Sequence, residues 1–438
     1  MRLWLVALVI TVGSTAVGGL SRPTAADATP LPEVTATASG SAHTCAIVDG
    51  ATVRCWGDNQ SGQLGTGTTT PQGAPVEVVA VAPGTGALRT VTQVSAGRAH
   101  TCAVVGRDGV ACWGNNSSGQ LGDGSTSVRS TPVMVLDPAG GPSLAGAKSV
   151  VAGLHHSCAL LSSSRVACWG NNTFGQLGDG TTTSSARAVI AVDDEGAPLS
   201  SIRQITSGAF HTCALTSSGS VHCWGNDFLG QRGDDVDLER ISQLAAGAFH
   251  TCALLADDSV RCWGANTSAQ LGNGTTTSSR TPVAVQAPGG RGQLGDVEEL
   301  TAGFRHTCAR TDDGAVHCWG DNMAGQLGQG STREIRTVVT VVGPTGDGAL
   351  ASIERVAASG NHTCAVDEDG RASCWGANDA GQLGRPARVG TVPLVVPHEL
   401  TEVKGVTGWP QPQLRAPHQR SGELLGRQRC GSARRQHH

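Results

Sequence analysis

One motif recurs seven times along this 438-residue chain, and it restricts the possible folds more than any other feature. Each copy begins with His, Thr or Ser, Cys and Ala, continues through about eight variable residues to Cys-Trp-Gly, and ends in Gly-Gln-Leu-Gly or a close variant. Successive first cysteines are 57, 56, 55, 39, 56 and 56 residues apart. A fixed period of this length indicates that one supersecondary unit is repeated along the chain.

Each unit carries the pattern of four short strands. In the fourth copy, the runs at 205–208, 213–215 and 221–223 predict three strands, with a turn at Ser218-Gly219 joining the last two. The Thr-Pro-Val segments at 131–133 and 281–283 predict a fourth strand, where proline is tolerated because the strand lies at a sheet edge. Four antiparallel strands per unit favour a propeller blade over a solenoid coil. The sequence therefore predicts an all-β fold over residues 32–400, a seven-bladed β-propeller of four-stranded antiparallel blades with one blade shortened.

Paired cysteines predict a disulfide within each blade. The second cysteine always follows the first by ten residues, and across a hairpin turn this offset can place the two side chains opposite one another. A closed loop of this length stabilises the fold by about 2 to 3 kcal/mol in the chain-entropy model. The alternative is a zinc site built from His43, Cys45, Cys55 and their equivalents, but it offers three ligands and no fourth. The predicted pairs are Cys45–Cys55, Cys102–Cys112, Cys158–Cys168, Cys213–Cys223, Cys252–Cys262, Cys308–Cys318 and Cys364–Cys374.

The repeated histidines and tryptophans are predicted to be structural. Because they recur in every unit, we expect the histidines to form a blade-internal hydrogen bond, and the tryptophans to pack between blades and against the disulfides. Gly62 and Gly65 fit a tight turn that needs positive φ, and Gln63 is expected to bond backbone groups there. The histidines are His43, His100, His156, His211, His250, His306 and His362. The tryptophans are Trp56, Trp113, Trp169, Trp224, Trp263, Trp319 and Trp375.

The N-terminus indicates export. Met1-Arg2, an apolar run from residue 3 to 12 and small residues near 16–26 form the three-part pattern of a signal peptide, which we place at residues 1–26. The alternative is a first buried strand. The apolar run is too short to span a bilayer, so no membrane span is predicted. An exported chain permits disulfides, and we expect the protein to be secreted or extracytoplasmic after cleavage.

These motifs resemble a known family. The pattern Cys-Trp-Gly-x-Asn-x-x-Gly-Gln-Leu-Gly, preceded by Gly-x-x-His-Thr-x-Ala, is similar to the regulator of chromosome condensation repeat, and the resemblance covers roughly residues 34 to 400. It implies a β-propeller, usually of seven blades. Departures are Asp227 for the Asn, Arg232 for the Leu and Ala269 for a Gly. The fourth unit is also 56 minus 39, or 17, residues short, which predicts loss of a Thr-rich loop and an edge strand.

The resemblance alone suggests guanine-nucleotide exchange, because the best-known eukaryotic member is a nuclear exchange factor for a small GTPase that docks on chromatin. Export and paired cysteines argue against that role. Charge argues against nucleic-acid binding: removing the eight basic and two acidic residues of 1–30 and 409–438 leaves 23 basic and 33 acidic residues, a net charge of -10.

The last segment differs abruptly from the repeats. Residues 400–408 still resemble the first strand of an eighth unit, but Arg, Gln, Pro and His dominate after Gly408. In a frame shifted by one base, the codons at Leu414 and Leu424 overlap cysteine codons ten apart within a repeat-like string. We therefore interpret residues 401–438 as the frameshifted remnant of an eighth repeat, disordered after 408, with Cys430 an accidental odd thiol. The alternative is a basic tail for anionic surfaces.

The leading functional hypothesis is a secreted, non-enzymatic binding scaffold, monomeric, with no cofactor. Variable inter-blade loops such as 71–90, 135–146 and 192–200 are expected to bind an unknown protein or cell-surface ligand. No unique cluster predicts catalysis. The alternative is an enzyme that acts on extracellular polysaccharide through carboxylates at the axial pocket. Calcium is a further alternative at Asp367-Glu-Asp-Gly, but the spacing does not match an EF-hand and turn chemistry explains the same residues.

Overall fold

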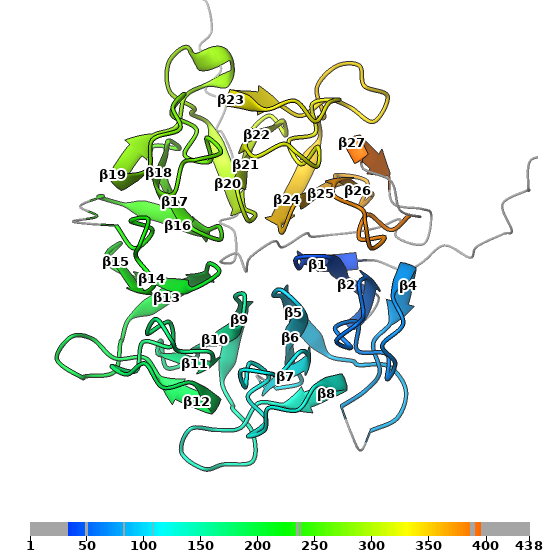
Figure 1. Ribbon diagram of the computed structural model, residues 1–438, viewed down its shortest axis with the longest axis vertical. Helices are drawn as coiled ribbons and strands as arrows, with labels where there is room; N and C mark the ends of the chain where they lie inside the picture. Colours follow the sequence, from blue (N-terminus) through cyan, green and yellow to red (C-terminus); the bar gives the residue numbers. More distant parts are fainter. Residues whose placement is uncertain are drawn as a thin grey trace, which may run out of the picture.

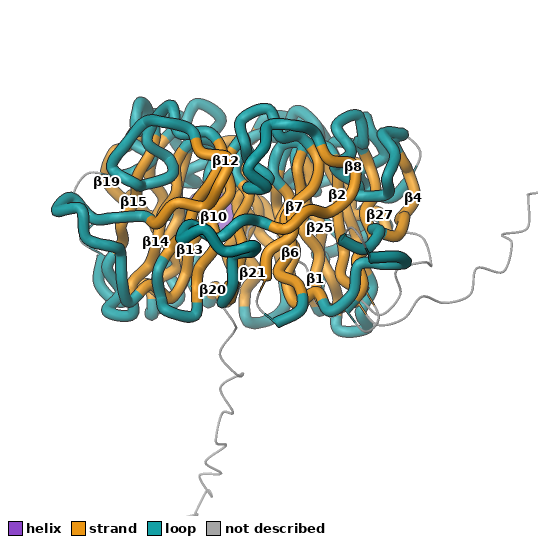
Figure 2. The backbone as a smooth tube through the Cα atoms, turned by 90° about the horizontal axis from the view of Figure 1, so that it is seen from below, coloured by secondary structure: helices purple, strands orange, loops and turns teal. Residues whose placement is uncertain are grey.

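The blades form a ring around one axis. The computed structural model describes residues 34–48, 51–81, 84–107, 109–233, 236, 238–385 and 390–395. Within them the chain forms seven antiparallel sheets that radiate from the centre (Figure 1). Seen from the side, the strands cross the ring between two layers of loops (Figure 2). The predicted seven-bladed β-propeller is confirmed.

Each blade is one contiguous stretch of chain whose first strand lies innermost (Figure 1). Blades 1 to 3 comprise β1 (Val34–Ser39), β2 (His43–Val48), β3 (Thr52–Gly57), β4 (Gln72–Glu77); β5 (Val91–Ala96), β6 (His100–Val105), β7 (Gly109–Gly114), β8 (Arg129–Met134); and β9 (Ala147–Ala152), β10 (His156–Leu161), β11 (Val166–Gly170), β12 (Ser185–Ile190).

Blade 4 has three strands, β13 (Ile202–Ser207), β14 (His211–Thr216) and β15 (Val221–Gly225). Blades 5 to 7 have four strands each, and one short 3-10 helix, η1 (Pro288–Gly290), precedes β20. Their strands are β16 (Ile241–Ala246), β17 (His250–Leu255), β18 (Val260–Gly264), β19 (Ser279–Ala284); β20 (Val297–Ala302), β21 (His306–Thr311), β22 (Val316–Gly320), β23 (Ile335–Thr340); and β24 (Ile353–Ser359), β25 (His362–Asp367), β26 (Ala372–Gly376), β27 (Gly390–Val395).

Because the strands alternate in direction, each blade has two distinct ends. The turn between the first and second strands and the Cys-Trp-Gly-x-Asn loop lie at one end, which we call the motif face. The turn between the second and third strands and the connection to the next blade lie at the other end, the connecting face. The variable loops expected to bind a ligand therefore share the connecting face. Isolated bridges such as Val192↔Pro198 fold them back on themselves.

Side chains on the second strand alternate between the two neighbouring blades. In blade 1, Cys45 and Ile47 share a core cluster with Trp113 of blade 2. Ala46 and Val48 share a cluster with residues of blade 7. Seven such clusters lie between successive blades, so each blade is held by apolar packing on both faces.

The shortened blade keeps its core while it omits its edge. In blade 1, a Cβ on Gly65 would touch Val78 and Trp113; in blade 4, a Cβ on Gly233 would touch Val236 and Trp263. Val236 therefore takes the place of Val78, although only two residues separate it from its glycine rather than twelve. Leu238, three residues before the next first strand as Leu88 is, packs on the same cluster. The chain omits the Thr-rich loop and fourth strand, as predicted, and retains the two apolar anchors that flank them.

The ring closes without a blade shared between the two chain ends. The strands β1 to β4 form one sheet, and β24 to β27 form another. The first and last blades meet through the same hydrogen bonds as other neighbours: Trp56 Nε1 donates to the Gln382 carbonyl at 3.0 Å, and Thr44 Oγ1 lies 3.0 Å from His362 Nε2.

The predicted signal peptide at 1–26 and the interpreted repeat remnant at 401–438, with Cys430, lie outside the described residues. No helix in the described part of the chain is both long and apolar enough to cross a membrane.

Candidate functional site

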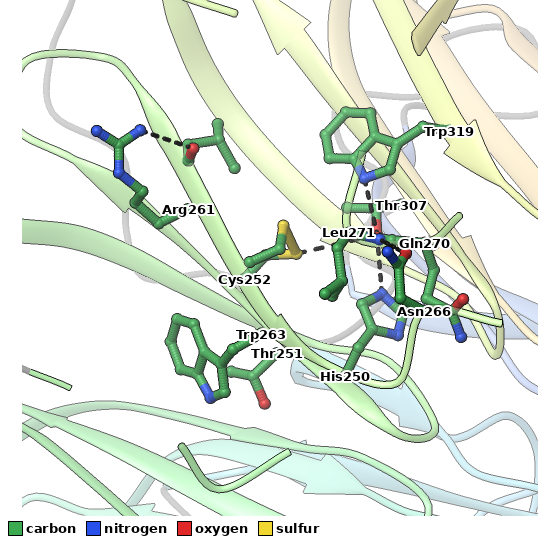
Figure 3. Close-up of a disulfide and its surroundings, with 12 residues drawn as sticks. His250, Thr251, Cys252, Arg261, Trp263, Asn266, Gln270, Leu271, Thr307 and Trp319 are labelled. Atoms are coloured by element: carbon green, nitrogen blue, oxygen red, sulfur yellow. Dashed lines mark hydrogen bonds between the residues drawn. A yellow bond between two sulfur atoms is a disulfide. The ribbon is translucent and has the colours of Figure 1, made fainter. Parts of the chain in front are cut away.

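The repeated polar residues form a hydrogen-bond network between blades. His43 Nε2 of blade 1 lies 2.9 Å from Thr101 Oγ1 of blade 2. That hydroxyl donates its proton to the Gln63 carbonyl of blade 1 at 2.9 Å, so His43 must donate through Nε2–H. Trp113 Nε1 donates to the same carbonyl at 2.9 Å. Figure 3 shows the equivalent groups between blades 5 and 6.

This network occurs at all seven blade interfaces. The expectation of a blade-internal histidine bond is wrong: the histidine side chain points, like the first cysteine, toward the next blade, where a Thr or Ser receives it. The seven sets are His43, Thr101, Gln63 and Trp113; His100, Ser157, Gln120 and Trp169; His156, Thr212, Gln176 and Trp224; His211, Thr251, Gln231 and Trp263; His250, Thr307, Gln270 and Trp319; His306, Thr363, Gln326 and Trp375; and His362, Thr44, Gln382 and Trp56.

Burial keeps the motif histidines neutral. It lowers the pKa of six of them to about 3 and that of His362 to about 4. Each Nδ1 is buried without a hydrogen-bond partner in the described structure. A neutral imidazole locked between two blades has no access to a substrate, so these residues hold the ring together rather than carry chemistry.

The seven disulfides form within the blades as predicted. Each joins directly opposed residues of the second and third strands, such as Cys45 and Cys55, with Cα atoms 4.0 to 4.1 Å apart. A disulfide sulfur is not a thiolate ligand, which removes the zinc alternative for these cysteines. Over the described ranges, no group of three or more His, Cys, Asp or Glu side chains could hold a metal ion.

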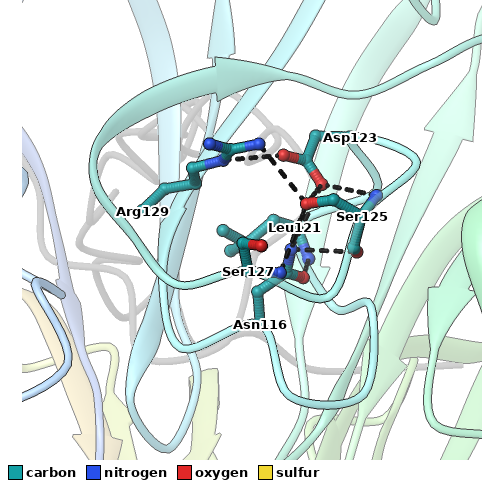
Figure 4. A network of polar contacts seen from close by, with 6 residues as sticks. All are labelled: Asn116, Leu121, Asp123, Ser125, Ser127 and Arg129. Atoms are coloured by element: carbon teal, nitrogen blue, oxygen red, sulfur yellow. Dashed lines mark hydrogen bonds and ion pairs between the residues drawn. The ribbon is translucent and has the colours of Figure 1, made fainter.

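The Cys-Trp-Gly-x-Asn loop is also occupied by its own hydrogen bonds. Gly62 and Gly65 adopt φ of 76° and 69°, as predicted. Gln63 Oε1 accepts the Ser61 N–H at 2.9 Å. Asn59 Oδ1 accepts the Leu64 N–H, and its Nδ2 donates to the carbonyls of the Thr-rich loop. Figure 4 shows the blade 2 loop, where Asp123 adds an ion pair with Arg129.

Four of the five phenylalanines form a row on the motif face, which the sequence had not indicated. Phe174 lies 5.5 Å from Phe210 and 5.9 Å from Phe228 between ring centroids, and Phe210 lies 6.1 Å from Phe249. The side chains of Phe228 and Phe174 are 80% and 37% exposed, and Leu229 beside them is 41% exposed. We call Phe174, Phe210, Phe228 and Phe249 the aromatic row.

A signal for the row was present in the repeats. Phe174 and Leu229 occupy the position before Gly-Gln, where the other five copies have Ser or Ala. Phe210 and Phe249 precede the motif histidine. Only the order of the blades around the axis brings these two positions together, which is why a scan along the chain does not reveal the row.

Cationic side chains bracket the aromatic row. Arg305 occupies the position of Phe249 in the next blade and is exposed. On the other side, Arg98 Nη1 lies 3.4 Å from His155 Nε2, and burial followed by the Arg98 charge lowers the pKa of His155. In the described structure neither Arg98 nor Arg305 forms an ion pair. Arg98 and Arg305 therefore place a positive charge on either side of the aromatic row.

Two of the alternatives depend on carboxylates in the axial cavity or at the loop of Asp367. The small axial cavity is lined by residues such as Ser41, Arg98, Leu154 and Phe304, with no carboxylate among its described lining. At the suggested calcium loop, Asp367 Oδ1 accepts the N–H groups of Asp369 and Arg371, and Asp369 pairs with Arg371. Turn chemistry thus uses these carboxylates.

Comparison with known proteins identifies the repeat. A protein-family model described as the regulator of chromosome condensation (RCC1) repeat matches residues 52–104, 109–160, 164–215, 257–310 and 313–366. A second family model with the same description matches residues 34–63, 91–120, 147–176, 202–231, 241–270, 297–326 and 353–382. The chain is 29% identical over 370 residues to the ultraviolet-B receptor UVR8 of Arabidopsis thaliana, covering 81% of this chain and 79% of the receptor.

Other relatives share part of their length or only the fold. The probable E3 ubiquitin-protein ligase HERC6 of Homo sapiens is 31% identical over 311 residues, which are 70% of this chain but 25% of that protein. Yeast RCC1 (Prp20), solved bound to Kap60, superimposes with a TM-score of 0.66 at 19% identity, covering 89% of this chain and 91% of that chain. On the strength of the repeat matches, this chain belongs to the regulator of chromosome condensation (RCC1) repeat family.

Proposed function

We propose that this protein is an exported, non-enzymatic scaffold that binds partner proteins on the motif face of its propeller. The observation that carries the proposal is the aromatic row, because exposed phenylalanines clustered on a rigid surface mark interaction sites. The row moves the expected binding surface from the variable loops of the connecting face to the opposite end of the blades.

Two further observations support this role. Seven disulfides are typical of an oxidising compartment, in keeping with the signal peptide predicted at 1–26, and they disfavour the cytoplasmic nucleotide-exchange alternative. Propellers of this fold bind proteins: yeast RCC1 binds Kap60, and a structure of Prp20p is described together with its binding to Gsp1p and histones. The net charge of -10 over residues 31–408 disfavours nucleic acid as a partner here.

The proposal is tested by cross-linking the exported protein to its partners in the producing cells. We expect the double variant Phe174→Ser and Phe228→Ser to lose at least about tenfold of the captured partner. Val128→Ser is the matched control, because Val128 is 50% exposed but belongs to blade 2. Equal capture by the double variant and the control would overturn the choice of face. A chain that remains in the cytoplasm with free thiols would overturn export.

A further inference from the structure

Blade 4 leaves the edge of β15 without the partner that the other blades supply. In blade 1, Val78 N–H donates to the Val53 carbonyl at 2.9 Å, and blades 2, 3, 5 and 6 repeat this bond just beyond the fourth strand. Val221, the equivalent of Val53, receives no such bond from the described residues. All five residues of β15 are at least partly exposed, whereas the residues of β11 are all buried.

The exposure extends into the groups behind the edge. Trp224 is only partly buried, although the other six motif tryptophans are at most 1% exposed. Cys223 is likewise the only second cysteine of a pair that is not fully buried in the described structure. In every other blade the fourth strand covers these atoms, so the absence of this strand from blade 4 explains their exposure.

The Thr-rich loop of blade 3 lies on the other side of the space that the missing strand leaves beside β15. The Thr-rich loop of one blade pairs with the fourth strand of the next: Gly67 N–H donates to the Ser130 carbonyl and Gly124 N–H to the Ala186 carbonyl, both at 2.9 Å. The loop of blade 3 has no such strand to meet in blade 4. Gly175 and Gly178 are accordingly partly exposed, while Gly62 and Gly65 are buried. We call the space between β15 and the blade 3 loop the strand slot.

The described residues behind the strand slot still pack as a core. Val236 and Leu238 pack on the cluster between blades 4 and 5, which contains Leu215 and Trp263. The missing strand therefore exposes backbone and a disulfide, while the described residues of this core cluster remain packed. Phe174 directly precedes Gly175, so the aromatic row borders the slot.

We propose that the strand slot binds an extended segment of a partner protein, which adds to blade 4 as its fourth strand. This rests on the proposed scaffold function and names its site and ligand chemistry. The slot continues an interface that the molecule already forms in six blades. Main-chain hydrogen bonds to a free sheet edge give affinity, and alternate side chains give specificity.

The six fourth strands show which side chains the segment needs. Their fourth residue is Pro, Ala or Val and turns toward the preceding blade. The fifth is Val in the strands of blades 1, 2, 3, 5 and 6, packs in the core cluster toward the next blade, and lies opposite the second cysteine, as Val283 lies opposite Cys262. A ligand with Thr-Pro-Val or Ala-Val at these positions would place its valine over Cys223.

The test uses the full exported chain and a synthetic peptide of residues 277–286, Thr-Ser-Ser-Arg-Thr-Pro-Val-Ala-Val-Gln. Calorimetry is expected to show one peptide bound per chain. Replacing the valine that corresponds to Val283 by Asp should weaken binding at least about tenfold, because a carboxylate would be desolvated over the disulfide. Hydrogen exchange of the β15 amides should slow on binding, while that of the β18 amides should not change.

A refilled variant provides the matched control. Replacing Asp234-Asp235 by residues 273–284 restores the twelve residues that separate glycine and valine in blade 5, and should abolish peptide binding. If the refilled variant fails to fold, the parent chain still tests the site by hydrogen exchange. The β15 amides should then be protected by the parent peptide and not by the peptide with Asp in place of the valine. Binding that survives in the refilled variant, no binding of the parent peptide, or a dimer of the chain that refilling dissolves would each overturn the proposal. The refilled variant keeps the aromatic row, so partner capture that persists there would reject the slot and leave the scaffold function standing.

Discussion

At the scale of single residues, the first strands use a bridging amide that one blade replaces by a carboxyl group. Gln93, Gln204 and Gln243 each donate through Nε2 to a carbonyl of the next blade and accept the N–H of the same residue through Oε1. Glu299 occupies this position in blade 6. Its Oε2 accepts the Val356 N–H at 3.0 Å, and its Oε1 is buried without a hydrogen-bond partner. A protonated carboxyl would reproduce the glutamine.

Burial raises the pKa of Glu299 to about 7, against the opposing effect of Arg310. Because the folded state holds this proton more tightly, its contribution to stability is full below pH 4.5 and is lost as pH rises through 7. We predict that Glu299→Gln raises the free energy of unfolding at pH 8 by about 1 to 3 kcal/mol and leaves it little changed at pH 4.5. Urea unfolding at both pH values measures this. Glu354→Gln, an exposed glutamate in β24 of the next blade, is the control and should change stability little at either pH. An equal effect of Glu299→Gln at both pH values would contradict the prediction.

The motif histidines give the stability the opposite pH dependence from Glu299 at the acid end: they destabilise the fold as the pH falls. Their pKa values are lowered toward 3, so the unfolded chain takes up protons below pH 6.5 that the folded ring refuses. Each histidine then costs up to about 1.4 kcal/mol per pH unit as the pH falls from 6.5 toward 3. We predict that His100→Gln weakens the fold at pH 8 by about 1 to 3 kcal/mol, through the lost bond to Ser157, and removes one proton from the uptake on acid unfolding. Calorimetric titration measures the uptake; His155→Gln, outside the network, should not change stability at pH 8.

At the scale of elements, the loss of the Thr-rich loop explains an exchanged side chain. Asn59 needs an oxygen for Leu64 N–H and an amide to hold the Thr68 and Thr70 carbonyls. Blade 4 has no such loop. There Asp227 still accepts the N–H of Arg232, and its second oxygen pairs with Arg280 of blade 5 at 2.5 Å. The Asn-to-Asp departure and the 17-residue deletion are therefore one structural change.

This pairing predicts a different outcome for the same exchange in two blades. Asn59→Asp would turn a carboxylate toward two carbonyls, so we expect a loss of about 1 to 3 kcal/mol and faster hydrogen exchange in residues 66–71. Asp227→Asn keeps the acceptor and loses only an exposed ion pair, worth at most about 1 kcal/mol. Exchange mass spectrometry and thermal unfolding of both variants would decide. Equal destabilisation would contradict the role assigned to the Asn59 amide.

The sequence predicted interactions within one hairpin correctly, but not those between neighbouring blades. The ten-residue cysteine offset and the glycines of the turn report on one hairpin, and local geometry decides both. The partner of His43 depends on which neighbouring blade its side chain faces, which the hairpin does not specify, so the blade-internal bond was wrong. Phe174, Phe210, Phe228 and Phe249 meet only through the order of blades around the ring. Spacing also revealed that blade 4 lacks an edge, but not that Val236 and Leu238 keep its core.

At the scale of the whole molecule, every interface between two blades is formed by noncovalent contacts. Each disulfide links residues ten apart within one blade, so none joins two blades. Six interfaces are additionally tethered by the chain that passes from one blade to the next. The interface between blades 7 and 1 has no such connection and relies on Thr44, Trp56, His362 and Gln382 together with apolar packing.

This difference predicts that matched substitutions act unequally around the ring. Thr44→Val with Trp56→Phe removes the bonds to Gln382 at the closing interface, and Thr101→Val with Trp113→Phe removes their equivalents at Gln63. Each pair should cost about 2 to 4 kcal/mol globally, because two buried donors are lost, and one carbonyl and one histidine Nε2–H are left without these partners. Only the closing pair should let the ring open locally, since separated blades there are not held together by a short connection. Native-state hydrogen exchange should then show faster exchange in β2 and β25 for the first variant. Equal exchange rates in both variants would mean that packing, rather than this hydrogen-bond network, closes the ring.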